Sequence, residues 1–157
     1  MGKRTLLTIF TVFIISCSNG DDSEFEFSLE GSVYSMTDIA GAWNAQFADF
    51  EELEVRDSGF EVITLGGTFT MTVQENGRFF AVMTLPDEPM EEFSGQFGFD
   101  GVNLVMLEDG DGPGDEAYFN RELTNDGQWK LDGDILYDLD DDGVLGNTIL
   151  RLRMELI

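Results

Sequence analysis

Histidine is absent from the 157-residue chain, and cysteine occurs once, at Cys17. Without histidine there can be no Ser-His-Asp triad, no Cys-His pair and no His-ligated zinc or iron site. A single cysteine forms no disulfide within the chain and no multi-thiolate metal site. Among the familiar catalytic sites, only those based on carboxylates or on oxygen-ligated metals remain. We therefore expect a protein that is not an enzyme.

Basic residues are also scarce, with 8 Lys and Arg against 32 Asp and Glu and a net charge of −24. Such a charge repels nucleic acid and favours cations or cationic partners, although an acidic surface also simply keeps an exported protein soluble. The hydrophobic content of 42%, with 14 Phe, is enough for a folded core. We therefore expect one acidic globular domain, monomeric, with no nucleic-acid partner.

The one apolar run, Leu6 to Ile15, follows Lys3 and Arg4 and ends just before Cys17. It is shorter than the ~20 residues that a membrane-spanning helix needs. A charged start, an apolar middle and a small residue at the cleavage point are typical of a secretory signal peptide, here residues 1–16.

The end of this run, Ile14-Ile15-Ser16-Cys17, resembles the lipobox of bacterial lipoproteins. The resemblance implies that Cys17 is lipidated, becomes the first residue after cleavage and anchors the protein in a membrane. Ser18 after the cysteine resembles lipoproteins that leave the inner membrane, which implies the outer membrane or the cell surface. The acidic run that follows looks like the surface-export signal of Bacteroidota lipoproteins, or it is a solvated linker. Residues 17–38 are expected to form an acidic flexible tether.

The expected domain, residues 39–157, consists of strand patterns separated by turn residues. Residues 67–73 alternate Phe, Met and Val with threonine, and Asn76-Gly77 predicts a hairpin to a return strand over 78–85. In the last strand, Leu150, Leu152, Met154 and Leu156 share one face. Other strands are expected over residues 93–99, 102–107, 117–123, 128–131 and 135–137, the last after a turn at Asp132-Gly133.

Eight to ten short strands joined by tight hairpins predict an all-β, antiparallel up-and-down barrel, with a β-sandwich as the alternative. Helix is expected only as a turn near residues 34–39. Residues 60–73 have room for one long strand, bent at Gly66-Gly67.

Gly41-Ala42-Trp43, at the start of the first strand, resembles the Gly-x-Trp signature of lipocalins. Residues 41–155 as a whole look like the lipocalin-like domains of exported Bacteroidota lipoproteins. The resemblance implies a lipocalin-like barrel in which Trp43 closes one end. It also implies that an arginine of the final strand, Arg151 or Arg153, packs over the indole ring by a cation–π contact.

The sharpest local motif is Asp-x-Asp-x-Asp-Gly at residues 138–143, which matches the first half of an EF-hand calcium loop. The twelfth position is Ile149, so the bidentate glutamate is missing, and a solvated acidic hairpin is the alternative. A second acidic loop, residues 109–116, is expected at the mouth of the barrel. The expected Ca²⁺ ligands are the side chains of Asp138, Asp140 and Asp142 and the carbonyl of Val144.

Two functions follow from a small barrel of this kind. If the interior is hollow, it binds a small apolar ligand; if Phe and Met fill it, the protein is a structural or interaction module with acidic loops. Gly95 and Gly98 favour some space. A third hypothesis, a carboxylate hydrolase, would need a buried pair of carboxylates inside the hollow. The residues that would bind the ligand are not identified by the sequence.

Overall fold

A computed structural model describes residues 27–53, 58–112, 114–124, 127–139 and 143–157. Within these residues, one short helix precedes nine strands, which confirms the helical turn expected over residues 34–39. In chain order the elements are α1 Met36–Ile39, β1 Gly41–Glu52, β2 Gly59–Glu61, β3 Thr68–Val73, β4 Arg78–Thr84, β5 Glu91–Asp100, β6 Asn103–Glu108, β7 Ala117–Leu123, β8 Gln128–Tyr137 and β9 Gly146–Leu156.

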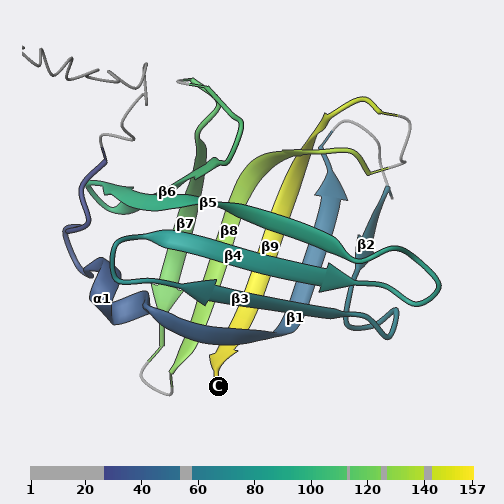
Figure 1. Cartoon of the computed structure of the whole chain (residues 1–157), viewed down its shortest axis with the longest axis horizontal. Coiled ribbons are helices and arrows are strands. Elements are labelled where there is room, and N and C mark those ends of the chain that lie inside the picture. The colour runs from purple at the N-terminus through teal and green to yellow at the C-terminus, as the bar shows by residue number, and fades with distance from the viewer. Residues whose placement is uncertain (1–26, 54–57, 113, 125–126, 140–142) are drawn as a thin grey trace, which may run out of the picture.

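Strand β9 pairs with β1, and this pairing closes the sheet into a barrel (Figure 1). The ring runs β1-β3-β4-β5-β6-β7-β8-β9, and every neighbouring pair is antiparallel. The extra strand β2 lies outside the ring, beside the second half of β1. The predicted antiparallel up-and-down barrel is confirmed, and its eight-stranded ring is compatible with a lipocalin-like fold.

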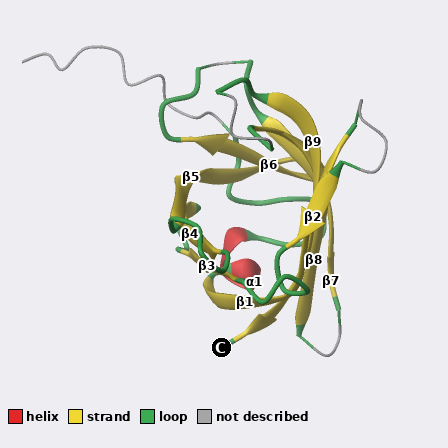
Figure 2. Cartoon of the chain, turned by 90° about the vertical axis from the view of Figure 1, so that its right-hand side faces the viewer, coloured by secondary structure: helices red, strands yellow, loops and turns green. Residues whose placement is uncertain are grey.

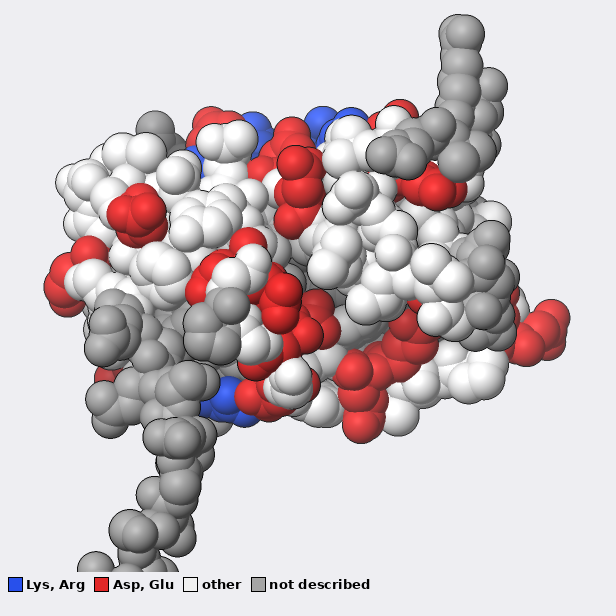
Figure 3. All heavy atoms as spheres, turned by 90° about the horizontal axis from the view of Figure 1, so that it is seen from above, with Lys and Arg blue, Asp and Glu red and all other residues white. Residues whose placement is uncertain are grey.

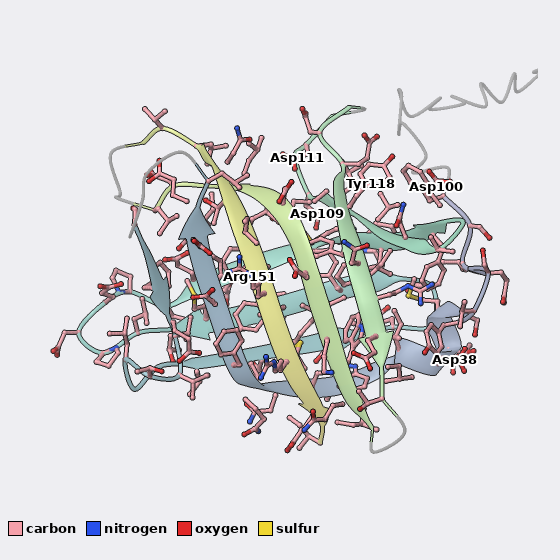
Figure 4. The ribbon with its side chains drawn as sticks, turned by 180° about the vertical axis from the view of Figure 1, so that it is seen from behind. Asp38, Asp100, Asp109, Asp111, Tyr118 and Arg151 are labelled. Carbon is pink, nitrogen blue, oxygen red and sulfur yellow. The ribbon has the colours of Figure 1, made fainter. Side chains whose placement is uncertain are left out.

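The alternation of apolar and polar residues decides which side chains form the core. In β9, Leu150, Leu152 and Met154 are buried, as the sequence predicts. Arg151 and Arg153 take the opposite, outer face, and Figure 4 shows Arg151 on the outside of the barrel.

Strand β1 changes its alternation partway along. Trp43 and Ala45 are buried, so continued alternation would bury positions 47 and 49. The buried residues are instead Ala48 and Phe50. The register against β9 shifts between Ala45 and Phe47, as at a β-bulge, where one extra residue reverses the faces of the strand. Because of this bulge, β1 contributes to the core along its whole length.

The predicted long bent strand over residues 60–73 is wrong. Strand β2 ends at Glu61 and β3 begins at Thr68, with a turn between them. The backbone N–H of Gly67 donates to the carbonyl of Val62 at 2.9 Å, and Gly66 has a φ of 87°, which favours glycine. The two glycines therefore complete a turn and do not bend a strand.

Asp132-Gly133 is likewise not a turn, because β8 passes through it without a break. Gly133 lies opposite Phe119 of β7. A Cβ atom on Gly133 would lie 2.6 Å from Cδ1 of Phe119 and 2.5 Å from the carbonyl oxygen of Tyr118. The glycine thus lets the phenylalanine ring pack on the strand backbone.

One end of the barrel is filled and covered by α1, which Figure 2 shows at the far end of the barrel. Met36 and Ile39 of α1 are 1% and 0% exposed. The indole Nε1 of Trp43 donates to the carbonyl of Ile39 at 2.9 Å, and the rings of Trp43 and Trp129 lie 5.3 Å apart. We call this the closed end, and Trp43 is one of the core residues that fill it.

Residues 27–38 pack against the barrel, so they do not form the tether expected there. Ser28 forms a β-bridge with Phe99, and the N–H of Ser32 donates to the carbonyl of Gly101 at 2.9 Å. The nine strands and the core residues that the structure describes lie between Met36 and Leu156, so the barrel closes within this range.

The predicted signal peptide, residues 1–16, the lipidation site Cys17 and the rest of the expected tether lie outside the described residues. In the part of the chain that is described, no helix is both long and apolar enough to cross a membrane.

Candidate functional site

The end of the barrel opposite α1 opens into a cavity of about 920 Å³, which we call the mouth cavity. Residues of the connections β2–β3, β4–β5, β6–β7 and β8–β9 surround it. A view from above shows acidic side chains around a hollow (Figure 3). The apolar part of the lining comprises Phe60, Leu65, Leu85, Pro89, Phe93, Met106, Ala117, Ile135, Leu136, Leu139 and Leu145, with the ring of Tyr137 beside them.

Aromatic rings form part of the wall between the mouth cavity and the core. Phe50 is 1% exposed and stacks on Phe60, with ring centroids 5.1 Å apart. Tyr137 lies 4.9 Å from Phe50 and 6.4 Å from Phe93. Phe60, Phe93 and Tyr137 also line the cavity, so they contribute aromatic surface to it.

Glu91 begins β5 on the inward face, because it shares the alternation of Phe93 and lies opposite the buried Met83. The hydroxyl of Tyr137 donates to Oε2 of Glu91 at 2.8 Å. Burial, and then the hydrogen bond to Glu91, raise the pKa of Tyr137 well above its usual range. The phenol therefore stays protonated and holds this carboxylate against the cavity wall.

Glu108 ends β6 on the face that carries the buried residues Leu104 and Met106, and it too lines the mouth cavity. Burial raises the pKa of Glu108, and the negative charges of Asp111 and Asp109 raise it further. Neither a hydrogen bond nor a cation among the described residues offsets this effect. A carboxylate in this position is held at an electrostatic cost.

The remaining charged groups of the lining are acidic as well. None of the described residues that line the mouth cavity is a lysine or an arginine. The acidic residues of the lining are Glu88, Glu91, Glu92, Glu108, Asp111, Asp115 and Asp138. The cavity therefore combines an apolar interior with a negative potential at its opening.

No family model, curated protein or solved structure matches the chain. The closed antiparallel barrel is compatible with a lipocalin-like fold. The candidate site rests on the geometry of the mouth cavity.

Asp111 and Asp115 of the second acidic loop line the mouth cavity, where this loop was expected, and Figure 4 places Asp109 and Asp111 at this end of the barrel. The first residue of this loop, Asp109, is bound by two side chains on the outer face of the barrel. Nη2 of Arg78 lies 2.6 Å from Oδ2 of Asp109, and the hydroxyl of Ser94 donates to the same oxygen at 2.7 Å. The hydrogen bonds from Arg78 and Ser94 lower the pKa of Asp109 to about 2.

Replacing Arg78 with alanine should lower the free energy of unfolding at pH 7 by about 0.5–1 kcal/mol, because solvent weakens a pair this exposed. The carboxyl has a lower pKa in the folded chain, so the pair stabilises it above about pH 4 and loses this effect as the pH falls toward 2. Urea unfolding of parent and variant at pH 7 and pH 2 measures both values. An equal difference at the two pH values would contradict this origin.

The predicted Ca²⁺ site lies only partly within the described residues. Asp140 and Asp142 are outside them, so the site remains a prediction. Oδ2 of Asp138 accepts a hydrogen bond from the N–H of Gly143 at 2.8 Å, and Val144 follows this turn. Within the described part of the chain, no three Asp, Glu, His or Cys side chains are grouped as a metal site requires.

The arginines expected to cover Trp43 lie elsewhere. Arg151 pairs with Asp49 at 2.8 Å and Glu51 at 2.6 Å, and the guanidinium of Arg153 lies 5.2 Å from the ring centre of Phe47. Both arginines alternate with the buried residues of β9 and therefore point outward, whereas Trp43 points into the core. The structure does not bring the predicted pair together.

A different arginine contacts aromatic rings near the closed end. The guanidinium of Arg121, in β7, lies 4.9 Å from the ring centre of Tyr34 and 4.4 Å from that of Phe99. Burial lowers the pKa of Arg121. The sequence contained no signal for this contact, because Phe99 and Arg121 belong to β5 and β7, which both flank β6, and Tyr34 reaches them from the segment before α1.

Two acidic residues of the mouth cavity could have been found from the sequence. Glu108 continues the alternation of Leu104 and Met106, and Glu91 stands two residues before Phe93. Each pattern places a carboxylate at the open end of an inward-facing row. An acidic residue at the end of a strand is equally typical of a solvated turn, so this pattern alone does not distinguish a cavity wall from a loop.

Proposed function

We propose that the protein is a lipid-anchored, extracytoplasmic binding protein that holds a small apolar ligand in the mouth cavity, without catalysing a reaction. The observation that carries this proposal is the cavity itself, whose volume of about 920 Å³ falls within the range of about 300–1,000 Å³ of small-molecule sites. Half-buried apolar side chains and aromatic rings in its lining supply the contact surface.

The location is proposed from the N-terminal sequence. The pattern of residues 1–17 supports export and a lipid on Cys17, with the membrane as the partner of that lipid. Ser18 and the acidic residues after it support the outer membrane or the cell surface of a Bacteroidota-type bacterium. The resemblance of residues 41–155 to the lipocalin-like domains of exported lipoproteins agrees with this location.

Replacing Cys17 with alanine should abolish lipid attachment and leave the precursor uncleaved, because no other cysteine offers a thiol. Incorporation of a labelled fatty acid, together with the mass of the protein in the membrane fraction, measures both effects in cells. Ser16→Ala is the control, since a small residue remains before the cysteine. A Cys17→Ala protein that is processed normally and stays labelled would contradict the anchor.

Native mass spectrometry tests the binding function. Residues 25–157 are exposed to an extract of the protein's own cells, and the bound mass is measured. We expect a discrete added mass of a few hundred daltons, which is the size that a cavity of this class holds. A bare protein after exposure would contradict the proposal and favour a barrel that acts through its surface.

A further inference from the structure

We propose that the ligand of the mouth cavity is an organic cation with an apolar body, such as an alkyl amine, whose charged group lies beside Glu108, in the field of the other acidic residues of the lining. This inference rests on the proposed binding function and adds the chemical class of the ligand. It excludes fatty acids, whose carboxylate would meet a lining without any lysine or arginine among its described residues.

The charge of the cavity selects the sign of the ligand. Seven acidic residues contribute to the lining. Arg78 is not part of the lining, because it pairs with Asp109 on the outer face, where Ser94 also bonds to Asp109. A cleft lined by charges of one sign concentrates field lines, so it attracts the opposite charge and repels its own. An ammonium group is therefore drawn into the opening, and a carboxylate is repelled.

Glu108 supplies the strongest local reason for a cation. Its side chain follows Met106 into the cavity, is half-buried, and has Asp111 and Asp109 as its charged neighbours. An ammonium group beside it would replace the water lost on burial with a direct charge-assisted hydrogen bond. Binding of the cation would thus offset the cost of burying this carboxylate.

Glu91 and the aromatic rings complete the proposed site. The hydroxyl of Tyr137 fixes the orientation of Glu91, so one acceptor is already positioned before binding. The ring of Tyr137 and the neighbouring rings of Phe93 and Phe60 line the same space. Such rings attract a cation through their faces and bury the apolar body of the ligand.

The test compares three probes that share one alkyl chain: octylammonium, octanol and octanoate. Isothermal titration calorimetry measures each with residues 25–157 at pH 7. We expect octylammonium to bind about tenfold more tightly than octanol, and octanoate to bind more weakly than both. Glu108→Gln should remove most of the preference for octylammonium and Glu91→Gln a smaller part of it, and both should leave the binding of octanol unchanged.

Glu75→Gln is the matched control, because it removes the same charge from the exposed β3–β4 turn at the other end of the barrel. Melting curves confirm that each variant is folded. Equal binding of the three probes would overturn the cationic ligand and leave the binding function standing. If none of the three binds, both proposals are contradicted; if Glu75→Gln abolishes the preference as strongly as Glu108→Gln, the assignment to the cavity is wrong.

Discussion

Replacing Ala117 with tryptophan should weaken the binding of octylammonium by about tenfold or more, while the free energy of unfolding changes by less than about 1 kcal/mol. Ala117 is the first residue of β7, faces the same side as the buried Phe119, and lines the mouth cavity. An indole at this position would project into space that the ligand needs. It would not displace the core, because the cavity lies open above it. Calorimetry and urea unfolding measure the two quantities.

Tyr118→Trp is the control for this experiment. The neighbouring side chain points to the outer face and is 45% exposed, so an indole there leaves the cavity unchanged. The control should bind octylammonium with the affinity of the parent. A folded Ala117→Trp protein with undiminished affinity would show that the ligand binds somewhere other than the mouth cavity.

Replacing Phe97 with alanine should cost about 3–5 kcal/mol of the free energy of unfolding, because it leaves a void in a closely packed core. Phe97 is 1% exposed, and its ring lies 4.5 Å from that of Phe79 and 6.1 Å from that of Trp129. The corresponding fall in melting temperature is about 10–20 °C for a domain of this size. Urea unfolding followed by tryptophan fluorescence measures the loss.

Phe80→Ala removes the same ring from the outer face, where Phe80 is 45% exposed on the neighbouring strand β4. It should cost about 1 kcal/mol or less, because little buried surface is lost. Equal losses for Phe97→Ala and Phe80→Ala would contradict the inward and outward faces assigned to β4 and β5.

The barrel could be predicted because its strands follow local rules. Alternation in Phe69, Met71 and Val73 and the turn at Asn76-Gly77 are both properties of neighbouring residues, and the structure pairs β3 with β4 around that turn. The closing pairing of β1 with β9 was inferred only indirectly, from the need to cover two sheet edges. It joins segments about a hundred residues apart, and no local pattern records such a distance.

The errors concern glycines whose role depends on a partner strand. Gly133 resembles a turn in sequence, but it gives room to the ring of Phe119. Gly95 was expected to leave space inside the barrel. A Cβ there would lie 2.7 Å from Cε1 of Phe79, so the phenylalanine ring already fills that space. A glycine that makes room for a neighbour cannot be distinguished from a glycine at a turn until the pairing is known.

The predicted contact between Trp43 and an arginine of the last strand is not formed, because the residues lie on opposite faces of the barrel wall. The outward direction of Arg151 and Arg153 follows from the alternation of β9, but the bulge near Gln46 decides which residues of β1 they meet. On the outer face Arg151 meets Asp49 and Glu51, whereas Trp43 points into the core. In the described structure the closed end of the barrel is packed and the other end is open.

The most direct test of the mouth cavity uses the methyl groups of methionine. Met106 lines the cavity, whereas Met36 and Met154 lie in the core at the closed end. With methyl-labelled methionine in residues 25–157, nuclear Overhauser effects from bound octylammonium should reach Met106 and neither of the other two. Contacts confined to Met36 or Met154, or a bound probe without any contact to Met106, would contradict binding in the mouth cavity.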